Sequence, residues 1–299
     1  MKLTKLDSIS NVKRFSIYEN KLFVWKGKLV IYDGAVISDV EINEINFFEG
    51  SFLLIINDWK DSKLINHKLN IEKVNAGSRY VIDQNGIEYK YTSLIWAADL
   101  KTFYKITETN GLSNKIQTQF GEAKIKMLER RGGDSIYTLF LEVDEPLESF
   151  TSISTGHFFY TPSKLGLGET HRQELKQMLG SWDKVTEEQV MTWLDKFTRL
   201  NTYEISIPGL KDPSLAPKGK TGLIISFLAE YDLFLKINEA GWYEKFIKEI
   251  EKRVLTVLSD SVYPMLKDKV LDQFSFTPLS IENRVGSSEG AITGWSFEE

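Results

Sequence analysis

The hydrophobic pattern along the first 60 residues is that of short β-strands. Apolar and aromatic residues gather in runs separated by glycine, asparagine and aspartate, the residues that favour turns. The runs lie at residues 14–18, 21–25, 28–32 and 51–57. The two runs on either side of Lys26-Gly27 are typical of a β-hairpin, and Asp33-Gly34 is typical of a second tight turn. The pattern predicts a β-rich segment over residues 1–68.

The next region predicts a second hairpin and then a buried strand. The runs 78–83 and 87–91 flank Gln84-Asn85-Gly86, a turn sequence. Residues 93–98 form a continuous apolar run, which is typical of a strand buried on both faces. Such a strand needs neighbours, and we expect residues 1–60 to supply them or to leave an exposed edge. Asp99 follows at a position that favours a helix N-cap.

Strands and helices come in groups over the rest of the chain. The period-2 and apolar runs predict strands at 122–130, 135–143, 154–161, 202–207, 221–229 and 271–277. Helical periodicity appears at 170–180, 187–200 and 240–258, and Thr186 and Gln189 have the spacing of a capping box. This grouping predicts an α+β fold with a mixed, mostly antiparallel sheet and covering helices.

Composition narrows the function classes. The chain has 299 residues, of which 42% are hydrophobic, and this length is enough for about two domains. Its formal charge is 37 − 42 = −5, so a nucleic-acid partner is not expected. The absence of cysteine excludes disulfides and thiolate nucleophiles. Apolar runs such as Phe52–Ile56 are too short to span a membrane. We expect a cytoplasmic protein, with peripheral membrane contact left open.

The short catalytic patterns in the sequence lack their required context. Gly286–Gly290 matches the G-x-S-x-G nucleophile elbow of hydrolases, but the elbow needs a histidine later in the chain, and the last one is His171. Gly219–Thr221 resembles the end of a phosphate-binding loop, but Ser214 stands where its first glycine should be. The three histidines have no metal-ligand spacing, so no metal site is expected.

Two clusters have both a structural and a functional interpretation. His157 begins an aromatic run in a predicted strand, so it is either a packed strand residue or the wall of an apolar pocket. Acidic residues gather at the end of another predicted strand, and a solvated strand end is the favoured interpretation. These residues are Glu142, Asp144, Glu145 and Glu148.

Five segments, in this order, carry a resemblance to known proteins. They are Leu94–Tyr104, Phe158–Thr170, Tyr203–Ser226, Ala240–Glu249 and Thr277–Trp295. Together they resemble the phytoene-desaturase and carotenoid-isomerase-like FAD-dependent oxidoreductases, which belong to the amine-oxidase-like flavoprotein group. The resemblance covers about residues 69–299.

The resemblance implies a Rossmann-type FAD domain interrupted by a substrate domain. Residues 69–120 would then be a remnant of the FAD-binding domain. Residues 121–299 would be the substrate-binding domain, with its last residues returning toward the FAD domain. The implied activity is desaturation, saturation or isomerisation of a hydrophobic, isoprenoid- or carotenoid-like substrate. The implied contacts are His157, Phe159 and Tyr160 for the substrate, and Arg284, Gly290 and Trp295 for the flavin.

Two departures from the family pattern shape the functional expectation. The family's G-x-G-x-x-G motif is absent, and its closing flavin segment would follow Trp295, whereas the sequence ends at Glu299. We therefore expect an incomplete flavoenzyme whose missing FAD-binding parts a second chain would supply. Enzymatic activity stays an open question, and no catalytic acid or base is assigned. The alternative is a non-catalytic module that binds an apolar ligand or a protein.

Overall fold

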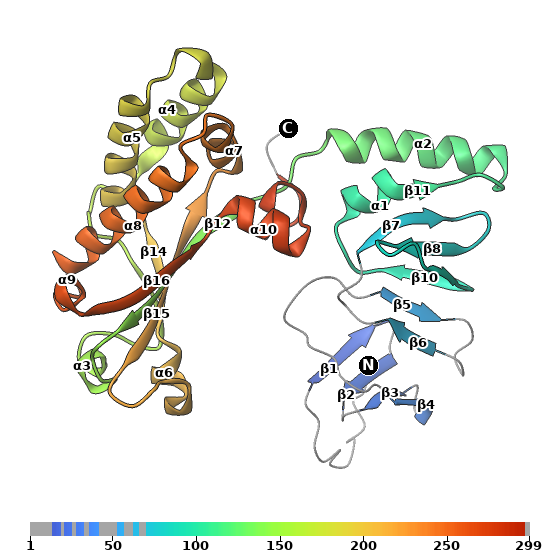
Figure 1. The fold of residues 1–299 in the computed structure, drawn as a ribbon, viewed down its shortest axis with the longest axis horizontal. Coiled ribbons are helices and arrows are strands. Elements are labelled where there is room, and N and C mark those ends of the chain that lie inside the picture. The colour runs from blue at the N-terminus through green and yellow to red at the C-terminus, as the bar shows by residue number, and fades with distance from the viewer. Residues whose placement is uncertain are drawn as a thin grey trace. The chain divides into compact units, whose positions relative to one another are not determined.

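The computed structural model describes residues 70–296 in full and, before them, the backbone of six strands. The chain divides into two units, which Figure 1 shows as ribbons. Unit 1 consists of Met1–Arg130 with Arg284–Ser288, and unit 2 consists of Arg131–Asn283 with Glu289–Glu299. Both units combine helices with mostly antiparallel strands, which confirms the α+β class. The sequence placed its boundary after residue 120, whereas the structural division falls after Arg130.

The six N-terminal strands form parts of two sheets. The first sheet is antiparallel in chain order, with β1 (Arg14–Tyr18), β2 (Lys21–Trp25), β3 (Lys28–Tyr32) and β4 (Val36–Glu41). The pairing of β2 with β3 confirms the predicted hairpin. The predicted turn at Asp33-Gly34 lies outside the described residues. The second sheet contains β5 (Leu53–Ile56) and β6 (Ser62–Ile65).

A small four-stranded sheet follows in unit 1, in the order β11-β7-β8-β9. Its strands are β7 (Ile71–Asn75), β8 (Tyr80–Asp83), β9 (Glu88–Lys90) and β11 (Thr107–Glu108). The Asp83 carboxylate accepts hydrogen bonds from the amides of Asn85 and Ile87, at 2.8 and 3.0 Å, and so fixes the predicted turn. Val74 and Val81 are the buried apolar centre of this sheet.

The apolar run at 93–98 forms β10 (Ser93–Trp96), which pairs with β5. A neighbour from residues 1–60 is therefore present, as expected. The expectation that this strand is buried on both faces is wrong, because its residues alternate between exposed and half-buried. The physical reason is that only one face of β10 packs: Leu94 and Trp96 lie against the core around Val74 and Val81, whereas Ser93 and Ile95 point the other way.

Two helices complete the N-terminal part of unit 1. Helix α1 (Leu100–Ile106) begins at Asp99, whose Oδ2 accepts the amide hydrogen of Thr102 at 2.7 Å, so the predicted N-cap is confirmed. Helix α2 (Asn114–Glu129) replaces the strand predicted at 122–130, and that prediction is wrong. The segment alternates in polarity but is built of Ala, Glu, Lys, Met and Leu, which favour helix. Phe120 anchors α2 through ring contacts with α1.

Unit 2 is built on a five-stranded antiparallel sheet, ordered β13-β14-β15-β12-β16. The strands are β12 (Ser135–Val143), β13 (His157–Tyr160), β14 (Tyr203–Ser206), β15 (Thr221–Ala229) and β16 (Val270–Phe276). The sequence predicted all five, with ends that differ by a few residues at β13.

Four helices cover one face of this sheet (Figure 1): α4 (Gly168–Gly180), α5 (Glu187–Leu200), α7 (Tyr231–Glu239) and α8 (Tyr243–Ser259). The capping box of Thr186 and Gln189 is present at the start of α5, as predicted. Helix α7 was not predicted. Four shorter helices lie elsewhere: α3 (Glu148–Thr151), α6 (Pro208–Lys211), α9 (Leu266–Lys269) and α10 (Pro278–Val285).

Candidate functional site

The two faces of the unit 2 sheet differ in how they are covered. Successive residues of a strand point to opposite faces. On the face under the helices, alternate residues of three strands are nearly inaccessible: Tyr137, Leu139, Leu141, Tyr203, Ile205, Leu223 and Ile225. On the other face, Phe159 is 67% exposed and Phe274 is 53% exposed. Side chains that are large and apolar therefore meet solvent on this second face.

The strand register aligns the residues of the second face in two rows. Paired residues of adjacent strands lie side by side on one face. The first row is His157, Ser206, Ile224, Phe140 and Phe274. The second row is Phe159, Glu204, Ser226, Thr138 and Phe276. We call these ten residues the open face.

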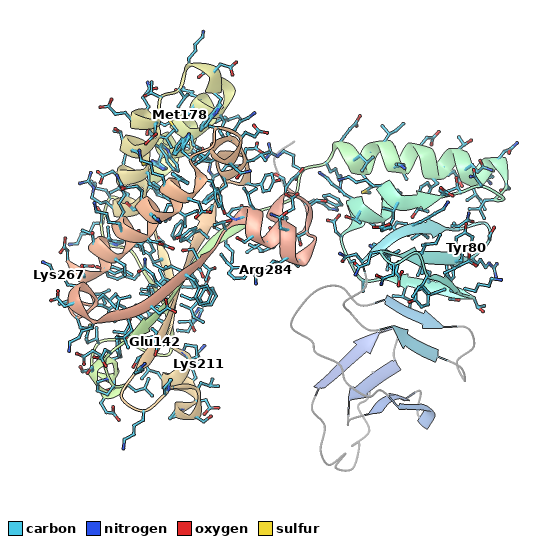
Figure 2. The ribbon with its side chains drawn as sticks, viewed as in Figure 1. Tyr80, Glu142, Met178, Lys211, Lys267 and Arg284 are labelled. Carbon is cyan, nitrogen blue, oxygen red and sulfur yellow. The ribbon has the colours of Figure 1, made fainter. Side chains whose placement is uncertain are left out.

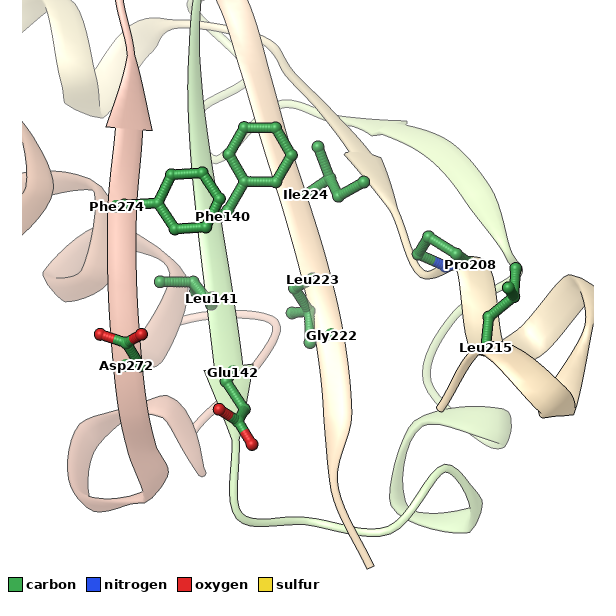
Figure 3. Close-up of a pocket in the computed structure, with 11 residues that line it drawn as sticks. Phe140, Leu141, Glu142, Pro208, Leu215, Gly222, Leu223, Ile224, Asp272 and Phe274 are labelled. Atoms are coloured by element: carbon green, nitrogen blue, oxygen red, sulfur yellow. The ribbon is translucent and has the colours of Figure 1, made fainter. Parts of the chain in front are cut away.

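The open face contains a hollow of about 290 Å³, shown in Figure 3. Phe140 and Phe274 lie beside it with nearly parallel rings, 4.6 Å between centroids and 7° between planes. Pro208 and Leu215 line its other side. The hollow is therefore mostly apolar, with aromatic rings on one wall.

Charged groups border the open face at two places. Beyond the first row, Glu142 and Asp272 are paired across β12 and β16 and both line the hollow. The Lys220 ammonium donates to Glu142 Oε1 at 2.6 Å, and this hydrogen bond raises the pKa of Lys220. At the far edge, His157 Nε2 lies 3.4 Å from Glu204 Oε1.

The structure brings together two of the three residues predicted to contact a substrate. His157 and Phe159 both lie on the open face, and their rings meet edge to face at 5.8 Å. Tyr160 lies on the opposite face, because it pairs with the buried Tyr203 and packs against the helix-covered core. The substrate roles themselves stay a prediction.

Of the residues predicted to contact a flavin, Gly290 and Trp295 have structural contacts within unit 2. Trp295 forms a β-bridge with Gly132. The Ser135 hydroxyl donates to the Gly290 carbonyl at 2.6 Å. Gly290 has φ +59°, and a Cβ there would lie 2.3 Å from the Pro278 carbonyl oxygen, so only glycine fits. These contacts fasten the C-terminal segment to the start of β12.

Arg284 belongs to unit 1, because the chain passes between the units within α10. Its side chain is among those labelled in Figure 2. It lies on an exposed part of the last turn of the helix. Its flavin role stays a prediction.

The G-x-S-x-G pattern has the wrong surroundings for a nucleophile elbow. Helix α10 precedes it, where the elbow needs a strand. The Ser288 hydroxyl donates to Asp99 Oδ2 at 2.9 Å, and its amide donates to Asp99 Oδ1 at 3.0 Å. These hydrogen bonds lower the pKa of Asp99, against the opposing effect of its burial. Ser288 is therefore a partner of a helix cap within unit 1.

The described residues do not fit the pyrophosphate of FAD. That group needs free amides at the N-terminus of a helix that follows a strand of a parallel sheet. Helix α1 does follow a strand, but the Asp99 carboxylate already takes the amide of Thr102 there. Helix α4 follows Gly166 and Gly168, yet β13 before it is an antiparallel edge strand. Neither of these two helix starts offers such a cradle, and the G-x-G-x-x-G motif that would build one is absent from the sequence.

Comparisons with known proteins find only remote likenesses. No family model matches the chain, and no curated protein matches it. A crystal structure of reduced UDP-galactopyranose mutase is similar over 71% of this chain and 34% of that one, with 11% identity and a TM-score of 0.43. The PF1083 protein from Pyrococcus furiosus is similar over 70% of this chain and 37% of its own, with 12% identity and a TM-score of 0.32. The chain thus spans little more than a third of either protein, and both likenesses are too remote to assign a fold or an activity.

The described residues contain neither a membrane-spanning helix nor a group of metal ligands. None of the helices within residues 70–296 is long and apolar enough to cross a membrane. In the same residues, no group of three or more His, Asp or Glu side chains could hold a metal ion.

Sequence reasoning missed Phe140, Ile224 and Phe274 as members of a site. A signal was present, because residues 135–143 are apolar at both odd and even positions. A strand that is apolar on both faces needs an apolar partner on each face. The helix layer covers only one face of this strand, so the other face was a candidate for a site.

Proposed function

We propose that the open face of unit 2 binds a hydrophobic small molecule. One observation carries the proposal: the apolar side chains of Ile224, Phe140 and Phe274, from three adjacent strands, lie in register on a face that meets solvent. An isolated exposed apolar residue needs no explanation, but a contiguous group marks a binding surface. The opposite face of the same sheet is fully packed, so the exposed side chains are not needed for the core.

The shape of the open face supports a small ligand. The hollow is lined by apolar groups with a few polar side chains near its edge, as in sites for small molecules. Its volume of about 290 Å³ is at the low end for such sites, so we expect it to hold part of a longer molecule that continues along the rows.

A dye titration tests this proposal. The probe is Nile red, a neutral apolar dye whose fluorescence rises on leaving water. We expect saturable binding to the full chain and a dissociation constant about tenfold higher for Phe274→Lys, because a charge replaces apolar contact area. Phe159→Lys should weaken binding in the same direction.

The matched control is Leu165→Lys. Leu165 is 85% exposed and lies outside the open face, in the loop before α4. This variant should bind the dye as the unaltered chain does. Equal losses in Phe274→Lys and Leu165→Lys, or no saturable binding at all, would contradict the proposal.

A second candidate function is an enzymatic reaction on the molecule that the open face binds. In it, the chain is an incomplete FAD-dependent oxidoreductase that desaturates, saturates or isomerises an isoprenoid- or carotenoid-like molecule held on the open face. Supporting it, the Asp99–Ser288 contact joins two of the segments that carry the family resemblance. Since residues 70–296 do not fit the pyrophosphate, a second chain would supply the FAD-binding parts.

Flavin retention tests the second candidate. The purified chain should show no flavin absorbance after gel filtration in excess FAD, because the sequence lacks the G-x-G-x-x-G motif that binds the pyrophosphate. A chain that retained FAD at one equivalent would contradict the need for a second chain. The dye titration is independent of this result.

A further inference from the structure

We propose that the hollow on the open face receives the positively charged end of an amphiphilic cation, such as an alkylammonium or amidinium compound. The inference rests on the proposed function, because it names the chemical class of the ligand that the open face binds. Three features of the hollow carry it: its carboxylates, its aromatic wall and its size.

The two carboxylates lie side by side although their negative charges repel each other. Glu142 and Asp272 are direct partners across β12 and β16, and like charges at such positions destabilise a sheet. Both line the hollow, and Figure 3 shows both side chains on the side that carries Phe140 and Phe274. A cation placed between them would relieve this repulsion.

The protein itself balances only one of these two negative charges. Lys220 pairs with Glu142 at 2.6 Å, so one of the two negative charges is balanced. Among the described residues, no ammonium or guanidinium group lies within ion-pair distance of Asp272. One Asp272 oxygen accepts the amide of the next residue, Gln273, at 2.9 Å. The rim of the hollow therefore keeps about one uncompensated negative charge.

The aromatic wall suits the same kind of ligand. Phe274 lies two residues from Asp272 on the same strand, so both side chains point to one face. Its ring stacks on Phe140 and is 53% exposed. A cation near an aromatic face is attracted by the ring quadrupole. An anion would meet the carboxylates and the negative ring faces together, so the site discriminates by charge.

The size of the hollow selects a small group with an apolar continuation. About 290 Å³ accommodates a substituted ammonium group with a few carbon atoms. Pro208 and Leu215 offer apolar surface opposite the rings, where the body of the ligand would lie. The ligand is thus an amphiphile whose charge sits at the edge of the sheet.

The experiment compares three probes of equal chain length by isothermal titration calorimetry: octylammonium, 1-octanol and octanoate, all below their aggregation concentrations. We expect octylammonium to bind the full chain about tenfold more tightly than 1-octanol, and octanoate to bind more weakly than 1-octanol. Raising the salt concentration should reduce the preference for octylammonium, because the carboxylates are partly exposed.

Asp272→Asn removes the charge with little change in shape. This variant should bind octylammonium and 1-octanol with similar affinity, while its affinity for 1-octanol is unchanged. Asp268→Asn is the matched control, since Asp268 is an exposed carboxylate of α9 that does not line the hollow. It should keep the full preference.

The outcomes separate this inference from the proposed function. If 1-octanol binds and octylammonium binds no better, the proposed function stands and the cationic ligand is wrong. If octanoate binds most tightly, Lys220 rather than Asp272 governs the site, and the inference is again wrong. If no probe binds, the proposed function fails, and the inference fails with it.

Discussion

The two faces of the unit 2 sheet are built from the same strands, but one is covered by helices and the other meets solvent. Ile224 and Ile225 are neighbours on β15, and only the second is fully buried under the helices. Both are equally apolar, so hydrophobicity alone does not decide which face is covered. The difference arises because α4, α5, α7 and α8 present their apolar stripes to one side. An apolar residue can therefore serve the core or a ligand, according to the face on which the register places it.

The largest expected difference between the faces is in stability. Ile225→Ala should lower the free energy of unfolding by about 2–5 kcal/mol, since it removes buried methyl groups and leaves a cavity. Ile224→Ala, one residue away on the open face, should cost less than half of that. Urea unfolding of the two variants measures the contrast. Equal losses would show that the open face is packed as tightly as the core.

The helix layer on the covered face should weaken in acid. His171 of α4 is buried against the rings of Trp193 and Phe197 of α5, with centroids at 4.6 and 5.3 Å. Burial lowers the pKa of His171 from its ordinary 6.5 to about 4, against the opposing effect of Glu174 and with a small contribution from Lys196 of α5. The folded state thus excludes a proton that the unfolded state accepts.

The sign of the pH dependence follows from that lowered pKa. The stabilisation is complete above pH 6.5 and is lost as the pH falls from 6.5 toward 4, by up to about 3 kcal/mol. His171→Phe keeps an aromatic ring in the stack and cannot be protonated. Thermal unfolding at several pH values should show a smaller acid loss in this variant. An identical pH profile in both proteins would contradict the role of His171.

A structural feature could be predicted from the sequence when it depends on residues that are neighbours along the chain. The strand 221–229, the helix beginning near residue 240 and the caps at Asp99 and Thr186 depend on neighbouring residues, and each was predicted. Helix α7 was missed because Glu230 stands at its N-cap, where Ser, Thr, Asp or Asn would have marked the start of a helix.

The candidate site depends instead on contacts between distant segments. His157 and Phe159 could be proposed from their aromatic surroundings alone. Their partners Phe140 and Phe274 could not, because only the pairing of β12 with β15 and β16 places those residues on the same face. Tyr160 was grouped with them for its position in the sequence, and the two-residue period of the strand places it on the other face.

The smallest expected effect tests whether the open face is open at all. Leu228 lies at the end of β15, opposite Ile136, on the same side of the sheet as the open face but beyond its two rows, and is 56% exposed. Leu228→Ser should change the free energy of unfolding by no more than about 0.5 kcal/mol, as for other surface substitutions. Phe227→Ser, at a position buried on the covered face, serves as the contrast and should cost several times more. Urea unfolding of both variants decides between two pictures of the face. If Leu228→Ser costs as much as a core substitution, Leu228 is covered in solution, and this side of the sheet belongs to an internal interface rather than to a binding surface.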